Sequence, residues 1–166
     1  MNHQTVQGAT PLHAEAAEHP LLAEWRRFTN EGLAASQAHC VAHAVTWHAR
    51  ALQVAHHLMA RPQPGIAEDD LVAAFLVAHV NLADCHAEMG QTVDAADCLY
   101  CAHHKLMALL HSETAPEAMQ LAAGKQLHMS HAALKQHCAR YGEHPLLAKA
   151  LHECSPHLVM PGSRLH

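Results

Sequence analysis

The chain has 166 residues, half of them hydrophobic, and a formal net charge of −5 with histidine counted as neutral. Its ten lysines and arginines are scattered, which argues against a nucleic-acid interface, because such an interface needs a clustered basic face. The longest apolar run, residues 71–78, is far shorter than the roughly 20 residues of a membrane-spanning helix. We therefore expect one domain that binds neither nucleic acid nor membrane.

Composition favours an all-α fold. Alanine and leucine are abundant, aromatic residues make up 4% of the chain, and the few glycines and prolines fall at predicted breaks. No run that alternates apolar and polar residues is long enough for a strand. The elements expected below are accordingly all helices.

The N-terminal stretch is polar over residues 1–10, and we expect it to be disordered. Thr10 and Pro11 could open a short helix that ends before Pro20. The stretch has neither the basic start nor the apolar core of a secretory signal, so we expect a cytoplasmic protein. In the cytoplasm the six cysteines would be reduced thiols rather than disulfides.

Residues 20–60 are predicted to form the first pair of helices. The first helix covers about 20–37, with Pro20 at its first position. The second covers about 40–60, and the sequence RPQPG at 61–65 marks a clear break after it.

Residues 69–111 are predicted to form a second, antiparallel pair. Apolar residues recur at spacings of three and four on either side of Gly90. Gly90 suits the position with positive φ that ends a helix, and Thr92 or Asp94 could cap the next helix. A link this short makes the two helices neighbours.

Residues 114–154 are predicted to form a third pair. Thr114 and Glu117 have the spacing of a capping box, with Pro116 in the first turn. A long helix then continues to about Arg140, and a short helix closes the pair.

The three pairs, at about 20–60, 69–111 and 114–154, belong to one domain that spans 11–154 and is followed by a tail at 155–166. Each pair is too narrow to bury its own apolar face. We therefore expect stacked antiparallel helical hairpins.

The central hairpin resembles one tetratricopeptide repeat (TPR) over about 34 residues, through the spacing Leu82-Ala83-x-x-His86-x-x-x-Gly90-x-x-x-x-Ala95-x-x-x-Leu99-x-x-Ala102. In that family small residues let two helices approach, and a glycine marks the turn. Placing Gly32 at the small-residue position brings His48 into the same register in the first hairpin. The resemblance implies a TPR-like right-handed array of about three hairpins, with a groove that takes a protein or peptide partner. The chain departs from the family where His79 and His86 replace large apolar or aromatic groups, and it lacks the proline that often closes a repeat.

Histidine is the most unusual feature of the composition, at 20 of 166 residues. Four of these histidines fall on predicted apolar stripes, so we expect them to be buried: His48, His79, His86 and His131. A buried imidazole needs a partner, because an unpaired polar group costs roughly 1–3 kcal/mol. Burial also disfavours its charged form. A neutral core histidine is the simplest interpretation of each one alone.

Histidine and cysteine also suggest metal ligands. His79 and His86 share a helix face, and we expect them to look toward Cys98 or Leu99 on the partner helix. With His131 of the next hairpin they would make an S/N metal site inside the stack. A second candidate set consists of Cys98, Cys101 and His104, which follow one another at one-turn spacing on the predicted helix. A single CxxC motif supplies at most two ligands, and the alternative is that these cysteines only pack as small residues. His39 and His43 lie one turn apart on a polar face that could instead be merely solvated. The candidate ligands are His39, His43, His79, His86, Cys98, Cys101, His104 and His131.

Two functions compete. Because the chain has no HExxH, phosphate loop, GxSxG or paired-carboxylate motif, we expect it not to be an enzyme. The first hypothesis is a non-enzymatic interaction module whose groove shows converging polar and aromatic side chains. The alternative is a cytoplasmic protein that binds, buffers or senses zinc, copper or nickel, since histidine excess is combined with six cysteines and seven methionines. A homodimer through an apolar outer face of the last hairpin stays open.

Overall fold

A computed structural model describes residues 17–154, which form six helices and no strands. The helices are α1 (Pro20–Gln37), α2 (Val41–Ala60), α3 (Glu68–Glu88), α4 (Thr92–Leu110), α5 (Glu117–Tyr141) and α6 (Pro145–Cys154). The predicted all-α class is confirmed. Within the described residues, none of the helices combines the length and the hydrophobicity that crossing a bilayer requires. The predictions for 1–10, for the helix at Pro11 and for the tail at 155–166 lie outside the described residues.

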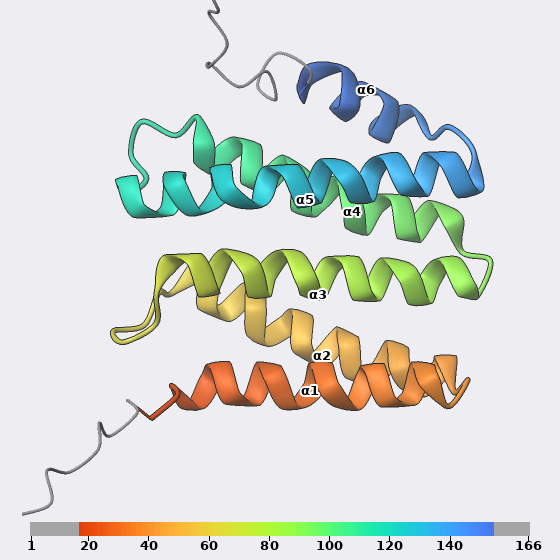
Figure 1. Ribbon diagram of the computed structural model, residues 1–166, viewed down its shortest axis with the longest axis horizontal. Coiled ribbons are helices and arrows are strands. Elements are labelled where there is room, and N and C mark those ends of the chain that lie inside the picture. The colour runs from red at the N-terminus through yellow and green to blue at the C-terminus, as the bar shows by residue number, and fades with distance from the viewer. Residues whose placement is uncertain (1–16, 155–166) are drawn as a thin grey trace, which may run out of the picture.

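The helices form three consecutive hairpins. Figure 1 shows α1, α3 and α5 running in one direction, with α2 and α4 returning between them and α6 returning beyond α5. Each helix packs against the next one in the chain, and α3 also packs against α5 and α4 against α6. No Cα atom of α2 lies within 8 Å of α4. Helix α3 is therefore the centre of the fold, since it contacts α1, α2, α4 and α5.

Gly90 closes the second hairpin, as predicted. It has a φ of 76°, and the N–H of Gln91 donates to the carbonyl of His86 at 2.8 Å. This bond across a left-handed residue satisfies a carbonyl at the end of α3. The predicted cap of α4 is wrong, because Gln91 is the N-cap and no side chain, of Thr92, Asp94 or any other residue, caps the helix.

His39 closes the first hairpin with the same kind of turn. It has a φ of 59°, and the N–H of Cys40 donates to the carbonyl of Ala35 at 2.9 Å. A left-handed conformation is unfavourable for a residue with a Cβ atom, although histidine tolerates it better than most. The turn geometry is thus common to both hairpins, although glycine supplies it in only one.

The predicted capping box at Thr114 and Glu117 is also wrong. Helix α5 begins after Pro116, with no side-chain cap. The hydroxyl of Ser112 accepts the N–H of Ala115 at 3.0 Å instead. The chain thus turns before Pro116, and Glu117 becomes the first helical residue.

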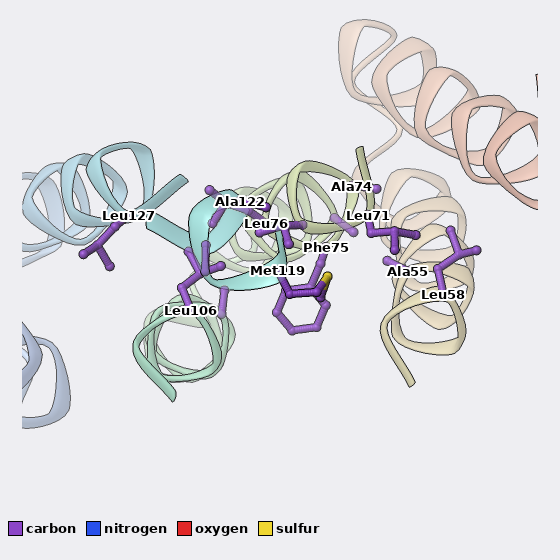
Figure 2. Close-up of a cluster of buried hydrophobic side chains, with 14 of the residues drawn as sticks. Ala55, Leu58, Leu71, Ala74, Phe75, Leu76, Leu106, Met119, Ala122 and Leu127 are labelled. Carbon is purple, nitrogen blue, oxygen red and sulfur yellow. The ribbon is translucent and has the colours of Figure 1, made fainter. Parts of the chain in front are cut away.

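The main core surrounds α3. Figure 2 shows Leu58 of α2, Phe75 of α3, Leu106 of α4 and Met119 of α5 within one cluster of buried side chains. Among the described residues, nine alanines have no exposed surface: Ala44, Ala51, Ala55, Ala78, Ala95, Ala96, Ala102, Ala122 and Ala123. Small side chains at the contacts allow short interaxial distances.

Helices α1 and α2 meet closely at Gly32 and His48. A Cβ atom on Gly32 would overlap the His48 ring, at 2.6 Å from each ring nitrogen. His48 is buried, as predicted, and its Nδ1 has no hydrogen-bond partner. Burial lowers the pKa of His48, so the ring is favoured in its neutral form. The His48 ring therefore packs directly against the backbone of α1 at Gly32, where no side chain intervenes.

We predict that Gly32→Ala destabilises the fold by about 1–3 kcal/mol, because overpacking outweighs the gain in helix propensity. Gly124→Ala is the matched control, since Gly124 is also helical and its added Cβ would meet Leu110 at an ordinary 3.5 Å. That control should gain up to about 1 kcal/mol in the free energy of unfolding, measured in urea. Adding His48→Ala should restore part of the loss in Gly32→Ala. Equal gains for the two glycine variants would contradict the close contact.

Candidate functional site

The structure does not gather the predicted metal ligands into one site. Within residues 17–154, no three side chains of His, Cys, Asp or Glu lie close enough to share a metal ion. His79 is buried, and its Nδ1 lies 2.8 Å from the carbonyl oxygen of Phe75 in the preceding turn. Its ring also packs edge-on against His56 of α2, at 5.1 Å between centroids. The expected pairing of His79 with Cys98 is therefore not formed.

Two of the four histidines expected in the core are only half-buried. His86 donates from Nδ1 to the Gln91 side-chain oxygen at 2.7 Å, near the surface at the end of α3. His131 is half-buried on α5, and burial, followed by the nearby Lys135 and His128, lowers its pKa. The prediction of burial is correct for His48 and His79 and wrong for these two.

Cys98, the first cysteine of the CxxC segment on α4, is not an activated thiol. Cys98 is half-buried, and burial, followed by the nearby Cys101, raises its pKa to about 11. Cys98 is therefore a protonated thiol at neutral pH rather than a nucleophilic thiolate. Cys101 is exposed, and so is His104, whose ring stacks on Tyr100 at 5.6 Å between centroids.

His39 and His43 do not form the predicted one-turn pair. The prediction assumed that both residues lie on one helix, but α2 begins only at Val41. His39 lies in the preceding turn with a positive φ, so its side chain leaves the backbone in a different direction. Both side chains are exposed.

A more promising arrangement lies on the surface shared by α3 and α5. At 100° per residue, one stripe of α3 spans about 80° and one stripe of α5 about 60°. The α3 stripe contains Asp69, Val77, Val80 and Asp84, and the α5 stripe contains Lys125, Met129, Gln136 and Arg140. We call these eight residues, with Tyr141, the α3–α5 face.

The two ends of the α3–α5 face carry charge. At one end, Lys125 and Asp69 form an ion pair of 2.6 Å between α5 and α3. Both groups are exposed, so the pair adds little stability, although it ties the two helices together. At the other end is a cavity of about 70 Å³, lined by Val80, Asp84, Leu99, Ala133, Gln136, His137, Arg140 and Tyr141.

The groups around this cavity influence one another. Desolvation, followed by the charge of Glu88, raises the pKa of Asp84, while Arg140 opposes the change. The Arg140 guanidinium lies 5.5 Å from the centroid of the Tyr141 ring, within cation–π range. The buried His137 ring is 4.9 Å from that of Tyr141, and burial lowers the pKa of His137. A carboxyl, a guanidinium and a phenol ring therefore converge above a neutral imidazole.

Apolar side chains are exposed between the two ends. Val77 is 37% exposed and Met129 is 61% exposed, and Tyr141 at the cavity is 37% exposed. Large side chains of this kind gain free energy when a partner covers them. The α3–α5 face thus combines apolar contact area with charged groups at both ends.

A second arrangement, which the sequence analysis missed, joins α4, α5 and α6. His103 is buried, with Nδ1 2.9 Å from the Ser130 hydroxyl and Nε2 3.3 Å from the Cys154 sulfur. Burial lowers the pKa of His103 to about 4 and raises that of Cys154. The pair is therefore a neutral imidazole and a thiol, unlike the imidazolium and thiolate of a cysteine nucleophile.

His103 was missed because the predicted stripe of its helix was too narrow. Helix α4 packs against α3, α5 and α6, so it buries a wider arc than a helix with one neighbour. The available signal was its position next to Ala102, a small residue of the TPR-like spacing, and three residues before the apolar Leu106.

Most of the described residues match a known family. Residues 23–159 match a family described as a protein of unknown function, DUF2753. The chain belongs to DUF2753. No curated protein matches it, and neither does any solved structure. The match includes the whole α3–α5 face and all three residues of the His103 arrangement.

We predict that this DUF2753 chain loses stability as pH falls from 6.5 toward 4. His79 and His103 have folded-state pKa values of about 4, below the value of about 6.5 in an unfolded chain. The unfolded state therefore binds protons in this range while the folded state does not, and stability is complete only above it. Lowering the pH from 7 to 5 should reduce the free energy of unfolding, measured in urea, by roughly 2 kcal/mol for each of these two histidines.

The control compares two substitutions at the same pair of pH values. His79→Asn should reduce the pH-dependent loss, whereas His43→Asn, at an exposed position, should leave it unchanged. Equal stability of the unmodified protein at pH 7 and pH 5 would show that these imidazoles are not held neutral.

Proposed function

We propose that this DUF2753 chain is a non-enzymatic, TPR-like helical-repeat module that binds a peptide segment of a partner protein on the α3–α5 face. The observation that carries the proposal is the convergence of Asp84, Arg140 and Tyr141 at a cavity beside the exposed Val77 and Met129. Polar groups that fix orientation, next to apolar contact area, are the usual composition of a recognition site.

The repeated geometry of the first two hairpins supports the scaffold part of the proposal. Val41 and Thr92 open α2 and α4, and His39 and Gly90 provide the preceding left-handed turns. Each of these pairs is separated by 51 positions, whereas the TPR repeat has about 34 residues. The likeness to TPR therefore concerns the small-residue contact and the turn, while the helices are longer.

The dimensions suit a short extended peptide. Fifteen residue steps of α3 separate Asp69 from Asp84, which corresponds to about 22 Å of helix. An extended peptide of about seven residues covers this distance. Met129 has a flexible side chain that can adapt to different apolar groups. Arg140 can pair with a carboxylate of the peptide, and Asp84 with a basic group.

The His103 arrangement supports a non-enzymatic role. His103 and Cys154 have the atom pairing of a cysteine catalytic dyad, but both side chains are buried. Their pKa values favour the unreactive thiol and the neutral ring. A substrate could reach this sulfur only if α6 moved away.

The proposal is tested with a displayed library of random twelve-residue peptides, selected against the purified chain and followed by calorimetric titration of the strongest binder. We predict that Val77→Asp and Arg140→Ala each weaken that peptide more than tenfold, because they remove the apolar contact and the guanidinium. Gln53→Ala is the control, at an exposed position on α2, and should leave the affinity unchanged. Selected peptides that bind all variants equally would place the interaction elsewhere, and failure to select any peptide would contradict the proposed function.

A further inference from the structure

Three potential metal-ligand atoms meet between α4 and α6. The Cys154 sulfur lies 3.3 Å from Nε2 of His103 and 3.6 Å from the thioether sulfur of Met107. His103 and Met107 are four residues apart on α4, so their side chains project from the same side of that helix. Cys154 reaches them from the end of α6. None of these atoms belongs to the metal sites expected from the sequence.

The two distances are close to those of a metal site. With metal–sulfur bonds of about 2.3 Å and metal–nitrogen bonds of about 2.0 Å, the 120° angles of a three-coordinate ion place a sulfur and a nitrogen ligand about 3.7 Å apart, and two sulfurs about 4.0 Å apart. The observed values of 3.3 Å and 3.6 Å are each shorter by about 0.4 Å. Small side-chain adjustments would therefore place an ion between these atoms.

Ser130 orients the imidazole for this role. Its hydroxyl lies 2.9 Å from Nδ1 of His103, and Ser130 is itself buried. When Nδ1–H donates to this oxygen, the lone pair of Nε2 is directed at Cys154. Histidines that bind metals almost always donate their second nitrogen to such a partner.

A small cavity lies beside His103 and Met107. It has a volume of about 40 Å³ and is lined by Tyr100, His103, His104, Met107, Ala150 and Glu153. This is enough space for about one water molecule or a single ion, but not for an organic substrate. The cavity thus offers a bare ion access to two of the three ligand residues.

We propose that His103, Met107 and Cys154 form a buried site for one Cu(I) ion. Thiolate and thioether sulfur select Cu(I), and imidazole also binds copper. One thiolate neutralises a monovalent ion, whereas Zn²⁺ would leave a net positive charge in a buried site, which is costly. On binding, the Cys154 thiol loses its proton to solvent as the sulfur–copper bond forms, and no electron is transferred. This site goes beyond the proposed peptide binding, and either can fail without the other.

The test is an anaerobic titration of the full, untagged chain with Cu(I) in competition with bicinchoninate. We expect one tightly held Cu(I) per chain, complete loss of that site in Cys154→Ser, and at least tenfold weaker binding in Met107→Leu. Leucine has nearly the volume of methionine, so Met107→Leu should melt close to the parent apoprotein and remains informative even if Cys154→Ser fails to fold.

The controls are Cys101→Ser on the exposed side of α4 and Met129→Leu on the exposed side of α5, and both should bind Cu(I) like the parent. X-ray absorption of the Cu(I)-loaded parent should show one nitrogen and two sulfur ligands. The proposal is overturned if no Cu(I) is retained, if Met107→Leu binds as tightly as the parent, or if Cys101→Ser weakens binding as much. A site that holds Zn²⁺ but not Cu(I) would overturn the assigned ion.

Discussion

Small residues at the helix contacts, mainly alanine with Gly32 on α1, set how closely the helices pack in this fold. Fully buried alanines occur on α2, α3, α4 and α5, so backbones approach where a larger core would hold them apart. The space that remains is filled in several places by imidazole. His48 packs on the bare backbone of Gly32, and His79 packs against Phe75. A flat ring suits narrow gaps between helices better than a branched side chain does.

Imidazole adds a requirement that an apolar ring would not. Each buried ring must remain neutral, because protonation would leave a charge in the core. Nδ1 of His79 is hydrogen-bonded to the carbonyl of Phe75, and Nδ1 of His103 to the hydroxyl of Ser130. Nδ1 of His48 has no hydrogen-bond partner. The partner of His103 lies on another helix, and the interaction therefore joins α4 to α5. The His103 ring contacts Ser130 through Nδ1 and faces the sulfur of Cys154 with Nε2. The same side chain therefore contributes both to helix packing and to the proposed copper site.

Local signals predicted the hairpins well. The prediction of a pair at 69–111 agrees closely with α3 and α4, because Gly90 and the spacing of apolar residues are local features. The turn of the first hairpin was harder to predict, because His39 adopts there the positive φ that Gly90 adopts in the second hairpin. The capping box failed because Ser112, which lies outside it, bonds Ala115 first.

Features that depend on several helices were predicted less well. The burial of His103 requires knowing that α4 has three neighbouring helices, and its contact with Cys154 joins residues 51 positions apart. The α3–α5 face similarly depends on α3 and α5 lying side by side, which neither helix reveals alone. Abundant histidine made many ligand sets conceivable, and only the packing of α4 against α6 brings His103 and Met107 to Cys154.

Nitrogen NMR of the histidine rings, recorded from pH 7 down to pH 4, would show the protonation state of each imidazole directly. We predict that His79 and His103 are neutral at pH 7 with the proton on Nδ1, donated to Phe75 and Ser130, and that both stay neutral well below pH 6.5. Rings that carry the proton on Nε2, or that become charged near pH 6.5 in the folded protein, would contradict the claim that neutral imidazoles complete the core.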